Sequence, residues 1–244
     1  MSNDLHLIQL SPNLSRLLPW AQRRGLVPDR GQGDLGYAFH AALRAAFANR
    51  APQPFSYRVG QGLLAYTIHA EAIRLAVAGA TPEMIDILGL NGTCQLQGFR
   101  IRPFPTIWKV GQSLSFEVRV RPVVRREDKE VDSFLSAADR SPNAELSREA
   151  VYIEWLKRQF KPVADLLEVH MSQFSLSTVV RRGSLQPEGS RPKFAVQGPD
   201  AVFTGVLRVV DGAGFALLVA RGIGRHRAFG YGMLLLKPAD TVWR

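Results

Sequence analysis

The sequence predicts an α+β protein built from two α/β units in tandem. Apolar residues alternate in several short segments, as in half-buried strands, and recur at helical spacing in others. The chain has 244 residues, of which 46% are hydrophobic, so two small domains could each bury a core. No sequence repeat with a period of roughly 20–50 residues is present, so any repeat would be one of structure.

Strands and helices alternate along the first half of the chain. Residues 5–10 are expected to form the first strand. Asp34 is a suitable N-cap for a helix over residues 35–48, with Leu35, Phe39, Leu43 and Phe47 forming its buried stripe. Further strands are expected over 55–59, 63–68, 94–101 and 114–120, and helices over 70–78 and 83–88. The resulting β-α-β(β)-α-β order over residues 1–120 is typical of a ferredoxin-like unit.

Residues 121–244 are expected to form the second unit. Its predicted elements are a helix over 147–160, a strand over 201–210, a short helix over 213–220 and a last strand over 233–236. The long polar segment 11–33 and the charge run 125–130 are expected to be loops. From residue 162 to 191 the pattern is less regular, and it ends in a basic tract.

The charge balance favours a nucleic-acid partner. Formal net charge is +10, with 31 Lys and Arg against 21 Asp and Glu, and most of the cations are Arg. The planar Arg guanidinium suits phosphates and stacks on bases. The sequence has no long apolar run for a membrane span and no signal-peptide core, so no membrane partner is expected. The single Cys94 excludes an internal disulfide and fits a reducing cytoplasm.

A glycine-rich stretch near the end combines a bending backbone with cations. Its glycines are Gly222, Gly224, Gly230 and Gly232, and its basic residues are Arg221, Arg225, His226 and Arg227. Exposed backbone N–H groups beside Arg form a site for phosphates. The spacing matches neither a Walker A loop nor a dinucleotide-binding fingerprint. The interleaved arginines therefore favour a nucleic-acid backbone as the ligand.

The predicted helix over 35–48 carries a compact polar face. Tyr37, His40 and Arg44 lie within about 60° of one another, and their centre is about 110° from the apolar stripe. A phenol, an imidazole and a guanidinium together could perform acid–base work on a phosphodiester.

Several other chemistries are not supported by the sequence. It has no Cys/His cluster with zinc spacing, no HExxH, no G-x-S-x-G and no carboxylate pair suited to two-metal catalysis. A nuclease of this composition should need no metal or other cofactor. RNA permits such a reaction, because its 2′-OH is an internal nucleophile.

Residues 221–235 closely resemble the C-terminal glycine-rich loop of CasE, a group of CRISPR-associated repeat-cleaving endoribonucleases in the RAMP superfamily. Arg227 occupies the place of that loop's cation, and Tyr231 replaces its common cysteine. Residues 203–207 look like the family's preceding strand, and residues 152–159 look like its helix with a Trp-Leu pair. Tyr37-Ala38-Phe39-His40 matches the family's Tyr-x-x-His.

The resemblance implies two tandem ferredoxin-like domains, over residues 1–120 and 121–244, the second with a basic insertion at about 162–193. It implies cleavage of CRISPR repeat stem-loops in precursor RNA, with His40 as general base or acid, Tyr37 assisting and Arg44 stabilising charge. The enzyme would then stay with the RNA in the interference complex. The residues expected to bind RNA are Arg23, Arg24, Arg181, Arg182, Arg191, Lys193, Arg221, Gly222, Gly224, Arg225, His226, Arg227, Gly230 and Gly232.

Two segments, 11–33 and 162–191, are longer than is usual in this group. They resemble the processing enzymes of type IV CRISPR systems, in which arginines carry cleavage, so Arg23, Arg24 and Arg44 are alternative catalytic residues. Two further functions stay open: a non-catalytic crRNA-binding subunit, and an unrelated basic binder of structured RNA or DNA.

Overall fold

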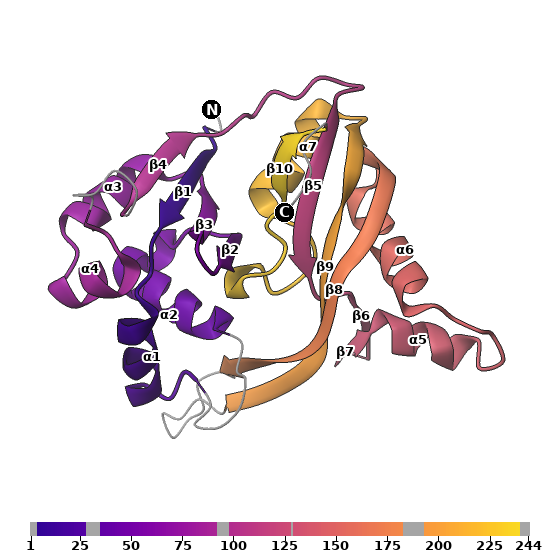
Figure 1. Ribbon diagram of the computed structural model, residues 1–244, viewed down its shortest axis with the longest axis horizontal. Helices are drawn as coiled ribbons and strands as arrows, with labels where there is room; N and C mark the ends of the chain where they lie inside the picture. The colour runs from indigo at the N-terminus through magenta and orange to yellow at the C-terminus, as the bar shows by residue number, and fades with distance from the viewer. Residues whose placement is uncertain (1–3, 28–34, 92–97, 128, 183–192, 240–244) are drawn as a thin grey trace.

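The computed structural model describes residues 4–27, 35–91, 98–127, 129–182 and 193–239. The described residues form two bodies of sheet and helix side by side, joined through the segment between β4 and β5 (Figure 1). The chain is therefore an α+β protein with two units, as its periodicity predicts.

The N-terminal unit has a four-stranded antiparallel sheet in the order β2-β3-β1-β4. Its elements are β1 (His6–Leu10), α1 (Leu14–Arg23), α2 (Gly36–Phe47), η1 (Ala48–Arg50), β2 (Phe55–Arg58), β3 (Gly62–Thr67), α3 (Ala70–Ala78), α4 (Pro82–Leu88) and β4 (Arg100–Pro103). This strand order and the β-α-β-β-α-β succession are those of a ferredoxin-like unit.

The C-terminal unit repeats the same topology in the order β10-β5-β9-β8. Its elements are β5 (Ser113–Val120), β6 (Val123–Arg126), β7 (Lys129–Asp132), α5 (Ser133–Arg140), α6 (Arg148–Phe160), β8 (Ala164–Arg182), β9 (Lys193–Val209), α7 (Gly212–Arg221), η2 (Arg227–Phe229) and β10 (Leu235–Pro238). The strand over 114–120, expected within the first unit, pairs with β9 and β10 instead.

Both segments expected to be loops contain regular structure, so those predictions are wrong. Residues 14–23 form α1 despite Pro19, because Leu17, Trp20 and Ala21 bury one face and the Asn13 side chain caps the first turn. The charge run 125–130 belongs to the β6–β7 hairpin. Residues 164–182, where the sequence pattern is less regular, form β8, which pairs with β9 in a long hairpin that curves under the N-terminal unit (Figure 1).

The apolar stripe of α2 packs as predicted, with Phe39, Leu43 and Phe47 buried. Asp34, the expected N-cap, lies outside the described residues, as does most of the segment 94–101. Two separate clusters of apolar side chains form the cores, one under α1, α2 and α4 and the other under α6 and α7.

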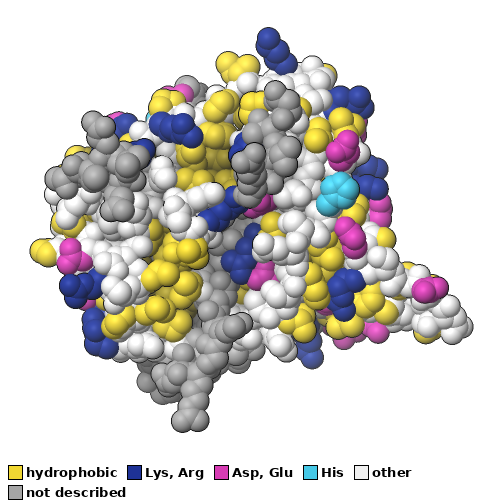
Figure 2. Space-filling model, in the orientation of Figure 1, with side chains coloured by type: hydrophobic (Ala, Val, Ile, Leu, Met, Phe, Trp, Pro, Cys, Tyr) yellow, Lys and Arg dark blue, Asp and Glu magenta, His cyan; other side chains and the backbone are white. Residues whose placement is uncertain are grey.

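Contacts across the boundary hold the two units together. The Tyr66 hydroxyl of β3 donates to the Leu234 carbonyl at 2.9 Å, and Arg58 of β2 pairs with Glu117 of β5. Basic and acidic side chains gather in the hollow between the units (Figure 2). The relative placement of α2 and the C-terminal loop is therefore fixed by direct contacts.

Candidate functional site

The predicted trio on α2 is partly exposed beside the helix's buried stripe. Phe39 and Leu43 are each 1% exposed, whereas Tyr37 and His40 are half-buried and Arg44 is exposed. The helical spacing that buries one set of residues leaves the other set at the surface. The Tyr37 and His40 rings lie 6.2 Å apart between centroids.

The glycine-rich loop packs directly against this polar face. The Phe229 ring of η2 lies 5.7 Å from the Tyr37 ring and 5.0 Å from the His40 ring, between centroids. His40 also makes a hydrogen bond with the backbone of Ala228. Two segments at opposite ends of the sequence thus meet at one place.

The environment of His40 favours the neutral imidazole. Burial lowers its pKa below the ordinary value of 6.5, and the positive charge of Arg44 lowers the pKa further. The hydrogen bond with Ala228 raises the pKa and opposes both effects. A neutral His40 can accept a proton at neutral pH, as a general base does.

Backbone hydrogen bonds close the glycine-rich loop at its two ends. The Ile223 N–H donates to the Gly232 carbonyl at 2.8 Å, and the Gly232 N–H donates to the Arg119 carbonyl of β5 at 2.7 Å. Gly222 and Gly232 have φ of 77° and 76°, a region in which a side chain is strained. A Cβ atom on Gly232 would lie 2.1 Å from the Ile223 carbonyl oxygen.

The cations of the loop divide between its surface and its interior. His226 is 8% exposed, and its Nε2 lies 2.7 Å from Glu130 of β7. Arg225 donates to the other Glu130 oxygen at 3.1 Å while staying at the surface. Arg227 donates to the Arg221 carbonyl at 2.9 Å, and burial followed by the charge of Arg221 lowers the pKa of Arg227.

Glu130 is a contact of the loop's cations that the sequence does not reveal. Its partners lie 95 and 96 residues further along the chain, and nothing in its own charge run distinguishes it. By neutralising part of the loop's charge, Glu130 fixes the loop's conformation and leaves Arg221 and Arg225 at the surface.

Two adjoining hollows lie where α2 meets the loop. The larger, about 800 Å³, is lined by loop residues that include Arg221, Arg225 and Arg227. The smaller, about 330 Å³, is lined by His40 and Arg44. Both hollows share Gln53 and Ala228, so a chain with phosphates in the larger hollow could reach His40 in the smaller.

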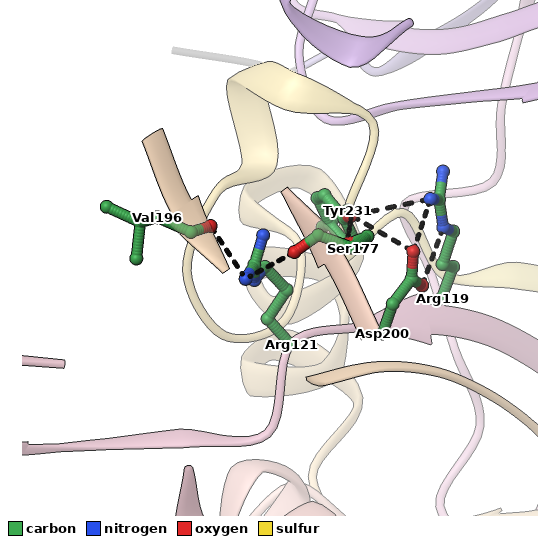
Figure 3. Close-up of polar contacts among 6 residues, drawn as sticks. All are labelled: Arg119, Arg121, Ser177, Val196, Asp200 and Tyr231. Carbon is green, nitrogen blue, oxygen red and sulfur yellow. Dashed lines mark hydrogen bonds and ion pairs between the residues drawn. The ribbon is translucent and has the colours of Figure 1, made fainter. Parts of the chain in front are cut away.

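A polar network anchors the loop to the long hairpin (Figure 3). The Tyr231 hydroxyl donates to Asp200 of β9 at 3.1 Å and lies 2.9 Å from the Ser177 hydroxyl of β8. Arg119 of β5 donates to both carboxylate oxygens of Asp200, at 2.9 and 2.5 Å. Arg121, 2% exposed, donates to the carbonyls of Ser177 and Val196 at 3.2 and 3.3 Å. Tyr231 thus joins the glycine-rich loop to both β8 and β9.

The remaining predicted residues lie elsewhere in the fold. Arg23 and Arg24, at the end of α1, approach Glu83 of α4 at 3.7 and 3.6 Å. Arg181, Arg182 and Lys193 lie at the end of the β8–β9 hairpin, which passes close to α2. Arg191 lies outside the described residues. The contacts therefore place His40, Tyr37, Arg44 and the loop in one site, and they do not bring Arg23 and Arg24 into it.

Among the described residues, no group of three or more His, Cys, Asp or Glu side chains is arranged to hold a metal ion. In the same part of the chain, no helix is both long and apolar enough to cross a membrane.

Solved structures share the fold over nearly the whole chain. A structure of CRISPR endoribonuclease Cse3 bound to 19-nucleotide RNA is 21% identical, covers 98% of this chain and 100% of its own, and has a TM-score of 0.65. Cse3 from Thermus thermophilus, bound to an RNA representing a pre-cleavage complex, is 20% identical with coverage of 96% and 100% and a TM-score of 0.61. A chain of a CRISPR RNA-guided surveillance complex, pre-nicking, is 17% identical with coverage of 96% and 99% and a TM-score of 0.56.

Comparison with curated proteins gave no match. The family model described as "CRISPR associated protein" matches residues 6–238. Because that match spans nearly all of the chain and both sheets, this protein belongs to the family of CRISPR-associated proteins.

Proposed function

We propose that the protein is a cytoplasmic, metal-independent endoribonuclease that cleaves the stem-loop of CRISPR repeats in precursor RNA. After cleavage it keeps the crRNA and acts as a subunit of the interference complex. The observation that carries the proposal is the packing of Tyr37 and His40 against Phe229 of the cationic glycine-rich loop, with Arg44 in the hollow that His40 and Ala228 line. The RNA-bound endoribonucleases that share the fold agree with it.

The proposed reaction gives each group one role. Neutral His40 takes the proton of the 2′-OH, whose oxygen attacks the adjacent phosphorus. The bond from phosphorus to the 5′-oxygen breaks, that oxygen takes up a proton from water, and the protonated His40 returns its proton to the solvent. The products are a 2′,3′-cyclic phosphate and a 5′-OH.

Arg44 stabilises the negative charge that builds up on the phosphorane, and Tyr37 orients the reacting groups. Arg221, Arg225 and Arg227 hold neighbouring phosphates in the larger hollow. The β8–β9 hairpin, with Arg181, Arg182 and Lys193 near its end, contacts the RNA stem through phosphates and A-form shape. Arg191, outside the described residues, is proposed to bind the same RNA.

Single-turnover cleavage of labelled repeat RNA in the presence of EDTA tests the proposal. General acid–base groups contribute about 10²–10⁴-fold to rate, so His40→Ala should slow cleavage by that factor. A matched control is His69→Ala, because His69 lies outside both hollows and contacts Arg50.

Four outcomes would count against parts of the proposal. A loss well below tenfold in His40→Ala would remove His40 from the mechanism. Inhibition of the wild type by EDTA would exclude the metal-free reaction. A gel shift without new bands would identify a non-catalytic crRNA binder, and cutting of a substrate with a 2′-deoxy nucleotide at the cut site would exclude attack by the 2′-OH.

A further inference from the structure

The smaller hollow beside His40 has the features of a nucleobase pocket. Its lining comes from four segments: α2, residues 49 and 51–53, Phe55 of β2, and Ala228 of the loop. Leu43 and Phe55 line it but are each only 1% exposed, so the hollow presents mainly polar groups, among them His40, Arg44, Asn49 and Gln53. Its volume of about 330 Å³ is near the lower end of the range of roughly 300–1,000 Å³ for small-ligand sites. A single base suits this size better than a longer segment of RNA.

Two side-chain amides in this pocket are available to a ligand. Asn49 and Gln53 are both exposed. Within the part of the chain that the structure describes, neither amide makes a hydrogen bond to another residue. Each amide carries a donor and an acceptor, the combination that reads the edge of a base.

The backbone that presents these amides is held in an uncommon conformation. Ala48, directly after α2, has φ of 49° and ψ of −127°, which a residue with a Cβ rarely adopts. This turn ends the helix, and residues 49–53 then line the pocket beside His40 and Arg44. Strained backbone persists where surrounding contacts enforce it, and such residues cluster at functional sites.

The two hollows suit different parts of a nucleotide, the larger one its phosphate and the smaller one its base. Arg221, Arg225 and Arg227 line the larger hollow and suit phosphates, whereas the smaller hollow presents two amides beside His40 and Arg44. Proteins that recognise RNA sequence take single unstacked bases into such pockets and read their edges.

We infer that the smaller hollow binds the base of one of the two nucleotides flanking the scissile phosphate, turned out of the stack, and that Asn49 and Gln53 read its edge. The inference rests on the proposed function and adds a sequence-specific subsite to it. Asn49 and Gln53 are specificity-determining residues in this scheme, and they take no part in the proton transfers.

Binding of uncleavable RNA tests the subsite separately from catalysis. The probe is repeat RNA with a 2′-deoxy nucleotide at the cut site, carrying each of the four bases or an abasic nucleotide at either flanking position. A well-placed amide pair discriminates between bases by roughly 5- to 140-fold. The wild type should therefore prefer one base at one position by at least about fivefold in Kd, and Asn49→Ala and Gln53→Ala should each reduce that preference.

Gln61→Ala is the matched control, because Gln61 is also an exposed amide of the N-terminal unit but lines a different cavity. This variant should keep the full preference. Equal affinity for all bases and for the abasic nucleotide at both positions would overturn the subsite. So would weaker binding by Asn49→Ala and Gln53→Ala with the preference unchanged. Failure of the wild type to cut uninterrupted repeat RNA would instead overturn the proposed function.

Discussion

Gly232→Ala should lower the free energy of unfolding for two reasons: strain in the backbone of residue 232, and loss of the hydrogen bonds that close the glycine-rich loop. An L-residue in the left-handed region costs about 1–2 kcal/mol. The new Cβ would lie 2.1 Å from the Ile223 oxygen, 0.9 Å inside the 3.0 Å below which such contacts essentially never occur. The loop must therefore open and lose the hydrogen bonds of Gly232 to Ile223 and Arg119, each contributing about 0.5–1.5 kcal/mol. The free energy of unfolding should fall by about 2–5 kcal/mol.

Gly60→Ala provides the matched control, because Gly60 has φ of 80° and a Cβ there would meet nothing within 4 Å. Both variants carry the same backbone strain, so their difference in urea unfolding should be about 1–3 kcal/mol, the contribution of two hydrogen bonds. Gly232→Ala should also cleave repeat RNA more slowly, since the displaced loop carries Ala228 and Phe229 away from His40. Equal destabilisation by the two variants would refute this account of loop closure.

Two further predictions concern His40 and Tyr231. Arg44→Gln removes a positive charge that lowers the pKa of His40, so that pKa should rise. Because cleavage needs neutral His40, the acid limb of the pH–rate profile should move to higher pH, whatever happens to the plateau. If the acid limb stays at the same pH in Arg44→Gln, a group other than His40 controls it. Tyr231→Phe keeps the ring under Arg119 but removes the hydroxyl bonded to Asp200, and urea unfolding should show a loss of about 1.5–3 kcal/mol. Tyr66→Phe is the control, because the Tyr66 hydroxyl bonds to a neutral carbonyl, and its free energy of unfolding should fall by about 0.5–1.5 kcal/mol. Equal losses in Tyr231→Phe and Tyr66→Phe would contradict the assignment of a charged partner to Tyr231.

Local periodicity was enough to predict much of the fold. The alternation of apolar residues located β1, β2, β3 and β5, and the spacing of Phe39, Leu43 and Phe47 located α2 and its buried face. The same spacing placed Tyr37, His40 and Arg44 together on the remaining surface. Periodicity can do this because a helix or strand that buries one face displays its pattern within a few residues.

Pairing between distant segments could not be predicted in the same way. The alternation of β5 shows that one of its faces is buried, but it does not say which sheet the strand joins. Likewise, α1 forms because tertiary burial of Leu17 and Trp20 outweighs the loss of a backbone donor at Pro19.

The sequence by itself determined the two-unit α+β fold, the polar face of one helix and the bending, cationic character of the C-terminal loop. Only the tertiary structure decided that Phe229 packs against Tyr37 and His40, that Glu130 holds His226, and that Tyr231 bonds to Asp200. The reason is physical. A residue's own type and spacing fix whether it is buried and which way its backbone can turn, but its contact partners depend on how complete units pack against each other.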